Sequence, residues 1–268
     1  MSADGTAGVV IDLNADLGEV PGDEGRRLDE ALLQVVTSAS IACGGHAGSP
    51  ATVRAACLAA ARGGVAVGAH VSYVDREGFG RRPLEVAVPL LVAQLGEQLE
   101  TLEVAARAAG TAVTYLKPHG ALYHAAAADP EQAGAVIDAV LRHGAATGRP
   151  LSVLGAPGSM LLTMAEAVGL AAVPEGFADR GYRPDGTLVP RGERGDLLVD
   201  PADVISQVVA LASTGLPPGV DPAAPVRVAS VCLHSDTPHA VVLARAVRDG
   251  LWSRHVTLRA FAPPPGSG

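Results

Sequence analysis

The sequence predicts an α/β fold in which about seven parallel strands close into a barrel. Short aliphatic runs without strict polar alternation recur along the chain, as expected for strands covered on both faces. Alanine-rich amphipathic segments separate these runs, and this alternation is typical of strand–helix units in a parallel sheet. An open, doubly wound sheet is the alternative architecture.

Each expected strand corresponds to one aliphatic run. The strands are residues 8–14, 36–43, 64–70, 112–117, 151–155, 170–174 and 226–234, with a weaker run at 255–261.

The expected helices have recognisable starts and stops. A capping side chain followed by proline marks helix starts at Ser49, Asp129, Asp200 and Asp236. Glycines supply plausible helix ends at Gly63, Gly110, Gly169, Gly215 and Gly250.

Two connections, residues 71–83 and 175–196, are long enough to suggest functional loops. The second contains Tyr182, Leu188 and Val189, which give it something to pack with, so we expect it to be ordered. Residues 216–225 are proline-rich and weakly specified. We expect one catalytic barrel domain over residues 1–262 and a flexible tail over 263–268.

The chain has 268 residues and a formal net charge of −8, which suits one barrel. Nucleic acids and anionic membranes bind clustered positive charge, so the composition argues against both partners. Three cysteines without zinc-site spacing indicate a reduced chain, and we find neither a signal peptide nor a membrane-spanning run. We therefore expect a cytoplasmic protein.

Four of the eight histidines stand where an aliphatic run stops: His46, His70, His119 and His234. The carboxyl ends of parallel strands meet at one rim, where α/β barrels hold their active sites. The pattern therefore predicts one shared site, and four unrelated loop histidines are the alternative. No GxGxxG follows the first strand and no GxxxxGK[ST] occurs, so the chain has no standard nucleotide cradle.

Motifs spread in order over nearly the whole chain resemble the LamB/YcsF family, also described as the A component of 5-oxoprolinase. They are DLNADLGE at 12–19, IACGGHAG at 41–48, GAH at 68–70, DREGFGR at 75–81, KPHGALY at 117–123, FADRGY at 177–182 and LVPR at 188–191. Ser40 and His124 depart from the family pattern.

The resemblance implies a seven-stranded, TIM-like (β/α) barrel similar to the glycoside hydrolase/deacetylase fold. It also implies ATP-dependent ring-opening hydrolysis of 5-oxo-L-proline to L-glutamate. The cofactor is then ATP with Mg²⁺, bound mainly by the partner B and C components, which are related to allophanate hydrolase. We expect those partners to supply a phosphorylated lactam to this chain, which could also form a homo-oligomer.

The candidates for catalysis are Asp16, His46, His70, Lys117 and His119. Asp16, placed just past the first strand, is a candidate general base or base-orienting group. His46 and His70 end adjacent strands and could reach one water or phosphoryl oxygen. Lys117 would direct a cation at a substrate carboxylate or phosphate.

The candidates for substrate binding are Asn14, Asp179, Arg180, Arg191 and His234. The arginines suit bidentate binding of carboxylate or phosphate, and Asn14 could orient a polar group beside Asp16.

Structural roles are open for several of these residues. Asp16 could belong to a turn, the histidines could be bonded rim residues, and Lys117 could pair with Asp16 or Glu175. Cys43 is better explained by packing than by nucleophilic chemistry, since nothing near it indicates a lowered thiol pKa.

Two other functions use the same residues. A metal-dependent deacetylase of similar fold would hold a divalent ion with Asp16, His46 and His70. Only 3% of residues are aromatic, which leaves few rings to stack on sugars, so we assign no metal. A non-catalytic substrate-binding or scaffold protein would tolerate substitution of Asp16 and Lys117.

Overall fold

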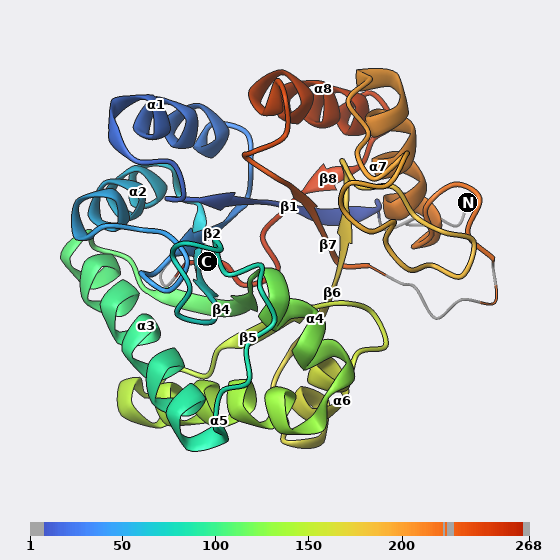
Figure 1. Ribbon diagram of the computed structural model, residues 1–268. Helices are drawn as coiled ribbons and strands as arrows, with labels where there is room; N and C mark the ends of the chain where they lie inside the picture. The colour runs from blue at the N-terminus through green and yellow to red at the C-terminus, as the bar shows by residue number, and fades with distance from the viewer. Residues whose placement is uncertain (1–7, 222, 224–227, 265–268) are drawn as a thin grey trace, which may run out of the picture.

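Across the residues that the computed structural model describes (8–221, 223 and 228–264), seven parallel strands close into a ring (Figure 1). They are β1 (Val10–Leu17), β2 (Ser38–Ala42), β3 (Ala66–Val71), β4 (Val113–Pro118), β5 (Ser152–Gly155), β6 (Ala172–Phe177) and β7 (Ser230–Leu233). Neighbours in the ring follow chain order, and β1 completes it by pairing with both β2 and β7. The predicted barrel is confirmed, and the open sheet is excluded.

Helices surround this ring (Figure 1). They are α1 (Gly22–Leu33), α2 (Pro50–Gly63), α3 (Val88–Ala108), α4 (Gly120–Ala128), α5 (Pro130–Thr147), α6 (Met160–Ala167), α7 (Pro201–Thr214) and α8 (Ala240–Trp252). Their buried aliphatic faces pack on the outer face of the strands and form the main hydrophobic core. Among the helices of the described residues, none is long and apolar enough to cross a membrane.

Most of the predicted helix starts are confirmed. The side chains of Ser49, Asp129 and Asp200 accept hydrogen bonds from backbone N–H groups in the first turns of α2, α5 and α7. The cap predicted at Asp236 is wrong: α8 begins at Ala240 after His239, and the Asp236 carboxylate instead accepts from Arg81 at 2.7 Å.

The predicted helix ends are correct only in part. Gly215 ends α7 in the left-handed conformation, as predicted, and Gly110 and Gly169 follow the capping residues of α3 and α6. Gly63 is the last residue of α2, whose cap is Gly64. The stop predicted at Gly250 is wrong, because this residue lies inside α8 where the helix passes close to Ile205.

Two strands run further than predicted. β1 continues to Leu17, so Asp16 lies inside the strand rather than just past it. β6 continues to Phe177, so Glu175 is a strand residue and not the start of a loop. Both strands continue because their polar side chains find partners inside the barrel, where the sequence pattern predicts only apolar groups.

The last strands are shorter than predicted. The seventh begins at Ser230, and residues 226–227 of the predicted strand lie outside the described residues. The weak run at 255–261 forms only β8 (Thr257–Leu258), which pairs with β1 outside the ring. Within the predicted tail, residues 265–268 lie outside the described residues.

Polar side chains inside the barrel, away from its carboxyl-terminal end, are joined by hydrogen bonds. The buried Asp12 carboxylate accepts hydrogen bonds from the hydroxyls of Thr37, Ser38 and Ser230. Burial raises its pKa to about 6, even though these three hydrogen bonds act in the opposite direction. Ser40, which departs from the family pattern, shares a 3.1 Å hydrogen bond with the Tyr115 hydroxyl.

Gly68 in β3 makes room for the Tyr115 ring inside the barrel. A Cβ atom at Gly68 would lie 2.1 Å from two ring carbons of Tyr115, which is fully buried. Gly68→Ala is therefore expected to lower the free energy of unfolding by about 1–3 kcal/mol, measured by urea denaturation. The control is Gly96→Ala in α3, where nothing lies within 4 Å, and a gain of up to about 1 kcal/mol is expected. Equal effects at the two positions would contradict the overpacking argument.

Candidate active site

The predicted site residues gather at the carboxyl-terminal mouth of the barrel. Asn14 and Asp16 lie in β1, His70 in β3 and Lys117 in β4. His46, His119 and His234 lie in the segments that directly follow β2, β4 and β7. The prediction of one shared rim is confirmed, because the side chains form two groups linked by a 3.4 Å contact between His70 Nε2 and Asp16 Oδ2.

Lys117, the sole lysine of the chain, is 2% exposed. Its Nζ lies 2.9 Å from Asp16 Oδ1 and 2.9 Å from Glu175 Oε1. It also lies 3.2 Å from Cys232 Sγ. Lys117 therefore pairs with both carboxylates that the sequence offered as alternatives. Because its donors are used by these partners, Lys117 positions and neutralises them rather than reaching freely toward a ligand.

Both members of this buried ion pair remain charged. Burial alone would raise the pKa of Asp16, but the neighbouring His70 and Lys117 hold it well below 3.8. Burial alone would lower the pKa of Lys117, but Asp16, Cys232 and Glu175 raise it well above 10.5. Asp16 is thus a fixed anion at the mouth of the barrel.

Two buried polar atoms beside this ion pair have no hydrogen-bond partner among the described residues: Glu175 Oε2 and the Tyr123 hydroxyl. The other oxygen of Glu175, Oε1, accepts from Asn14 Nδ2 at 3.0 Å, so in the described part of the chain only this one of the two carboxylate oxygens has a hydrogen-bond partner. Burial and then the Glu175 charge raise the pKa of Tyr123 well above 10.0. Tyr123 therefore stays protonated, and its hydroxyl is a buried donor without a partner among the residues described.

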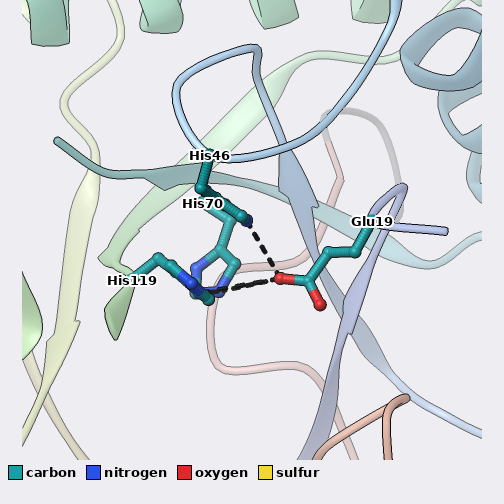
Figure 2. A group of neighbouring side chains, drawn as sticks. All are labelled: Glu19, His46, His70 and His119. Carbon is teal, nitrogen blue, oxygen red and sulfur yellow. Dashed lines mark hydrogen bonds and ion pairs between the residues drawn. The ribbon is translucent and has the colours of Figure 1, made fainter. Parts of the chain in front are cut away.

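The second group contains three histidines and Glu19, which point toward one another in Figure 2. Glu19 Oε1 lies 3.0 Å from His46 Nε2, 3.6 Å from His119 Nδ1 and 3.8 Å from His70 Nε2. His119 Nδ1 and His70 Nε2 are 3.0 Å apart. All four coordinating atoms lie within 4.8 Å of one another, so these side chains could hold a metal ion.

In each histidine, the ring nitrogen that faces away from Glu19, here called the outward nitrogen, is hydrogen-bonded to an acceptor. His70 Nδ1 donates to the Lys117 carbonyl at 3.2 Å, and His119 Nε2 donates to the Phe79 carbonyl at 2.9 Å. His46 Nδ1 lies 3.0 Å from Ser72 Oγ, whose own hydrogen is donated to the Tyr73 carbonyl. The outward nitrogen of each ring therefore carries a hydrogen.

His46 and His119 are neutral. Burial lowers the pKa of each to about 2, and in both cases His70 is the second cause. Their rings stack with centroids 3.7 Å apart and planes 6° apart, an arrangement that two neutral rings adopt more readily than two cations.

The first long connection covers this histidine group. Phe79 and Gly80 have positive φ angles of 54° and 63°, and a Cβ atom at Gly80 would lie 2.9 Å from the Cβ of His46. Strained backbone of this kind is held only where its surroundings fix it. Here the hydrogen bond from His119 to the Phe79 carbonyl fixes the loop against the ring.

Asp179 and His234 form a third contact at the mouth. Asp179 is fully buried and accepts from His234 Nδ1 at 2.9 Å, from the His234 backbone N–H at 3.1 Å and from the Thr237 hydroxyl. The His234 ring also stacks on Phe177, which lies 5.7 Å from Lys117 Nζ. This pair therefore connects the end of β7 to the second long loop.

The His234–Asp179 pair is expected to stabilise the fold most at lower pH. Burial alone would lower the pKa of His234, but Asp179 raises it above 6.5, so its contribution is present below that value and is lost as pH rises through the raised pKa. His234→Gln is expected to lower the free energy of unfolding by about 2 kcal/mol near pH 6 and by less near pH 9. Urea denaturation at both pH values measures this, and equal losses would contradict it.

The two arginines predicted to bind substrate have different positions. Arg180 donates to the carbonyls of Val189 and Asp196, so it braces the second long loop and lies outside the polar centre. That loop is ordered as predicted, with a bridge between Tyr182 and Leu188. Arg191 is 35% exposed at the rim, 3.9 Å from Asp236.

Three residues that are not among the predicted candidates complete the site: Glu19, Glu175 and Tyr123. Glu19 and Tyr123 are the last residues of the motifs at 12–19 and 117–123, and this place in a motif is the sequence feature that could have identified them. The sequence offers Glu175 only as a possible partner of Lys117, because this residue follows a proline in a segment whose pattern predicts a loop. His124, the other departure from the family pattern, is exposed on α4.

Cys43 packs as predicted. It is 2% exposed within the main core, and its thiol donates to the Ile41 carbonyl at 3.3 Å. Burial raises its pKa far above 9.0, which opposes a nucleophilic role.

A second group with metal-ligand spacing is Asp16, Cys232 and His234. The ammonium of Lys117 already lies 2.9 Å from Asp16 and 3.2 Å from Cys232, so a cation occupies that position. These residues therefore do not fit a metal ion.

Comparison with known proteins gives a consistent result along the chain. Residues 11–265 match the model of the LamB/YcsF family. A Streptomyces avermitilis protein, named as the A component of 5-oxoprolinase, is 52% identical over 257 residues, which cover 94% of this chain and 100% of the relative. A Mycolicibacterium gilvum protein of the same name is 48% identical over 253 residues, 94% of this chain and 99% of the relative.

Solved structures agree with the fold. A lactam utilization protein from Thermus thermophilus superposes with a TM-score of 0.83 at 35% identity, over 94% of this chain and 99% of that one. A protein from Enterococcus faecalis described as a putative cellobiose-phosphate cleavage protein has a TM-score of 0.56 at 10% identity, over 94% and 97% of the two chains. The second likeness concerns the fold alone.

Proposed function

Because this chain belongs to the LamB/YcsF family, we propose that it is the A component of an ATP-dependent 5-oxoprolinase. The complex would open 5-oxo-L-proline to L-glutamate, and this chain would act with two further components, B and C. The names of its relatives and of the Thermus thermophilus neighbour, which concern 5-oxoproline and lactams, support this proposal.

The observation that carries the proposal is the pair of unpartnered atoms beside Lys117. Among the described residues, Glu175 Oε2 is a buried acceptor and the Tyr123 hydroxyl is a buried donor, and neither has a partner. Phosphorylation of the lactam carbonyl leaves the ring nitrogen as an acceptor, to which the Tyr123 hydroxyl could donate, and Glu175 Oε2 could accept from the attacking water. Both atoms gain a partner when the phosphorylated lactam and the water bind.

ATP is needed because an unstrained five-membered lactam is a stable amide. Phosphorylation of the carbonyl oxygen makes the carbon open to attack by water. The sequence contains no GxxxxGK[ST] loop, and its lysine is paired with Asp16 and Glu175 rather than free to bind phosphate. We therefore assign phosphorylation, ATP and Mg²⁺ to the B and C components.

Hydrolysis requires two proton movements. The attacking water loses one proton as its oxygen bonds to the lactam carbon and its second as that oxygen becomes the carbonyl of an acyl phosphate. The ring nitrogen, which phosphorylation of the carbonyl oxygen leaves without a hydrogen, gains two protons as its bond to that carbon breaks. A second water converts that acyl phosphate to glutamate and phosphate. We propose that Asp16, the anion at the mouth, accepts the first proton of the attacking water. Lys117 would hold Asp16 in place.

The test is glutamate release from 5-oxo-L-proline with ATP and Mg²⁺, comparing this chain alone, the B and C components alone, and all three together. We expect glutamate only from the complete mixture. If B and C hydrolyse ATP but the complete mixture makes no glutamate, the substrate assignment is wrong. If Asp16→Asn and Lys117→Met support full activity in the mixture, the chain is a scaffold.

A further inference from the structure

The Glu19, His46, His70 and His119 side chains converge on one point beside β1, β2, β3 and β4 (Figure 2). We propose that these four residues bind a divalent transition-metal ion of the zinc type. The proposal is independent of the substrate, because it rests on the ligand atoms of these four residues and not on Tyr123 or Glu175.

The first argument is the direction of the lone pairs. The outward nitrogens of His46, His70 and His119 carry the hydrogens, because Ser72 Oγ and the carbonyls of Lys117 and Phe79 accept from them. The inward atoms, His46 Nε2, His70 Nε2 and His119 Nδ1, are therefore the nitrogens that can present lone pairs to an ion. Outer acceptors that fix the imidazole tautomer in this way are the usual support of metal-binding histidines.

The second argument is a contact that is unfavourable without a cation. His70 Nε2 and His119 Nδ1 are 3.0 Å apart, and His119 Nδ1 carries no hydrogen because its ring is neutral and donates through Nε2. With the hydrogen of a neutral His70 on Nδ1, the two nitrogens face each other as lone pairs, which repel at that distance. A cation between them and the Glu19 carboxylate converts the repulsion into three attractive contacts.

The third argument is the spacing of the ligand atoms. Zinc bonds to histidine nitrogen and carboxylate oxygen of about 2.0–2.1 Å give a tetrahedron with edges of about 3.3 Å. Four of the six distances between these atoms are 3.0, 3.0, 3.6 and 3.8 Å, and all six lie within 4.8 Å. The spacing is therefore near that of a zinc site, and the stacked rings of His46 and His119 would have to turn relative to each other to bind one ion.

The ligand chemistry selects the class of ion. Imidazole nitrogens suit zinc, cobalt, nickel and iron better than magnesium or calcium, which prefer oxygen. This set differs from the deacetylase-type set predicted as an alternative, because Glu19 takes the place of Asp16. One oxygen of Asp16 is held by Lys117, whereas Glu19 faces all three rings.

Metal content is the direct test and needs neither the B and C components nor substrate. The full-length chain, without a histidine tag, is purified and its metals are counted by mass spectrometry. It is then stripped with a chelator and titrated with Zn²⁺ or Co²⁺. We expect about one bound ion per chain, and a visible Co²⁺ spectrum of the intensity typical of four-coordinate sites.

Variants locate the ion. Glu19→Gln, His46→Gln and His119→Gln are expected to abolish the Co²⁺ spectrum. Ser72→Ala removes the acceptor that orients His46 and is expected to weaken Zn²⁺ binding by about 10–100-fold. His124→Gln, an exposed histidine outside the group, is the matched control and is expected to bind as the unsubstituted chain does.

Two results would overturn the proposal. The first is a stripped, folded chain that binds neither Zn²⁺ nor Co²⁺ at one equivalent, a result that depends on no variant. The second is equal binding by Glu19→Gln, His119→Gln and His124→Gln, which would place the ion elsewhere. Neither result bears on glutamate release, so failure here is distinguishable from failure of the proposed function.

Discussion

Lys117→Met is expected to lower the free energy of unfolding by about 3–5 kcal/mol and to abolish glutamate release by the complete mixture. Lys117 lies 2.9 Å from both Asp16 and Glu175, and methionine fills a similar volume without charge. The substitution leaves two buried carboxylates with no cation, and this uncompensated charge is the source of the loss. Urea denaturation measures the stability, and a glutamate assay measures the activity.

The double variant Lys117→Met/Glu175→Gln separates charge from packing. It removes one of the two orphaned charges, so it is expected to recover about 1 kcal/mol or more of the lost stability. Activity should stay absent, since Asp16 still lacks its partner. A Lys117→Met protein within about 1 kcal/mol of the unsubstituted chain would show that the ion pair is not an important part of the fold.

Asp16→Asn is expected to reduce the rate of glutamate release by about 10²–10⁴-fold at saturating B and C components. The amide keeps the shape of the side chain but cannot accept a proton from water. Lys117 keeps its contact with Glu175, so the loss of stability should be smaller than for Lys117→Met. The rate of glutamate formation and the unfolding midpoint are measured on the same preparation.

Asp12→Asn is the matched control for Asp16→Asn. Asp12 lies in the same strand and is also buried, so Asp12→Asn makes the same chemical change in β1 away from the mouth. It bonds to three hydroxyls below the mouth and has no assigned role in the reaction. We expect a rate within about threefold of the unsubstituted chain. If both variants lose the same activity, Asp16 has no special chemical role.

The fold follows from the sequence because strand burial is a property of local composition. The aliphatic runs predict every strand of the ring, and Ser49, Asp129 and Asp200 predict three helix starts correctly. The predicted ends of β1 and β6 are wrong for one physical reason. A polar residue normally ends a buried strand, whereas Asp16 and Glu175 are bonded inside the barrel.

The sequence predicts the location of the site but only part of its composition. Strand-end histidines indicate a shared rim because parallel strands share an edge. Glu19 is missed because its role depends on reaching three other strands, which no local pattern shows. A local sequence pattern also cannot predict that the Lys117 ammonium pairs with two carboxylates at once. That pairing depends on Asp16 from β1 and Glu175 from β6 meeting Lys117 from β4.

The pairing of β1 with β7, which closes the barrel, determines when the candidate site is complete during folding. β1 pairs with β2 early in the chain, but its other neighbour in the ring is β7, where Asp12 lies opposite Ser230 and Ala15 opposite Leu233. Contacts between residues so far apart in sequence form slowly relative to local ones. During synthesis, Asp16 and Lys117 can therefore meet before Cys232 and His234 have left the ribosome. The candidate site is completed only by the last strand of the ring, so a nascent or truncated chain that lacks β7 has an open edge and an incomplete site.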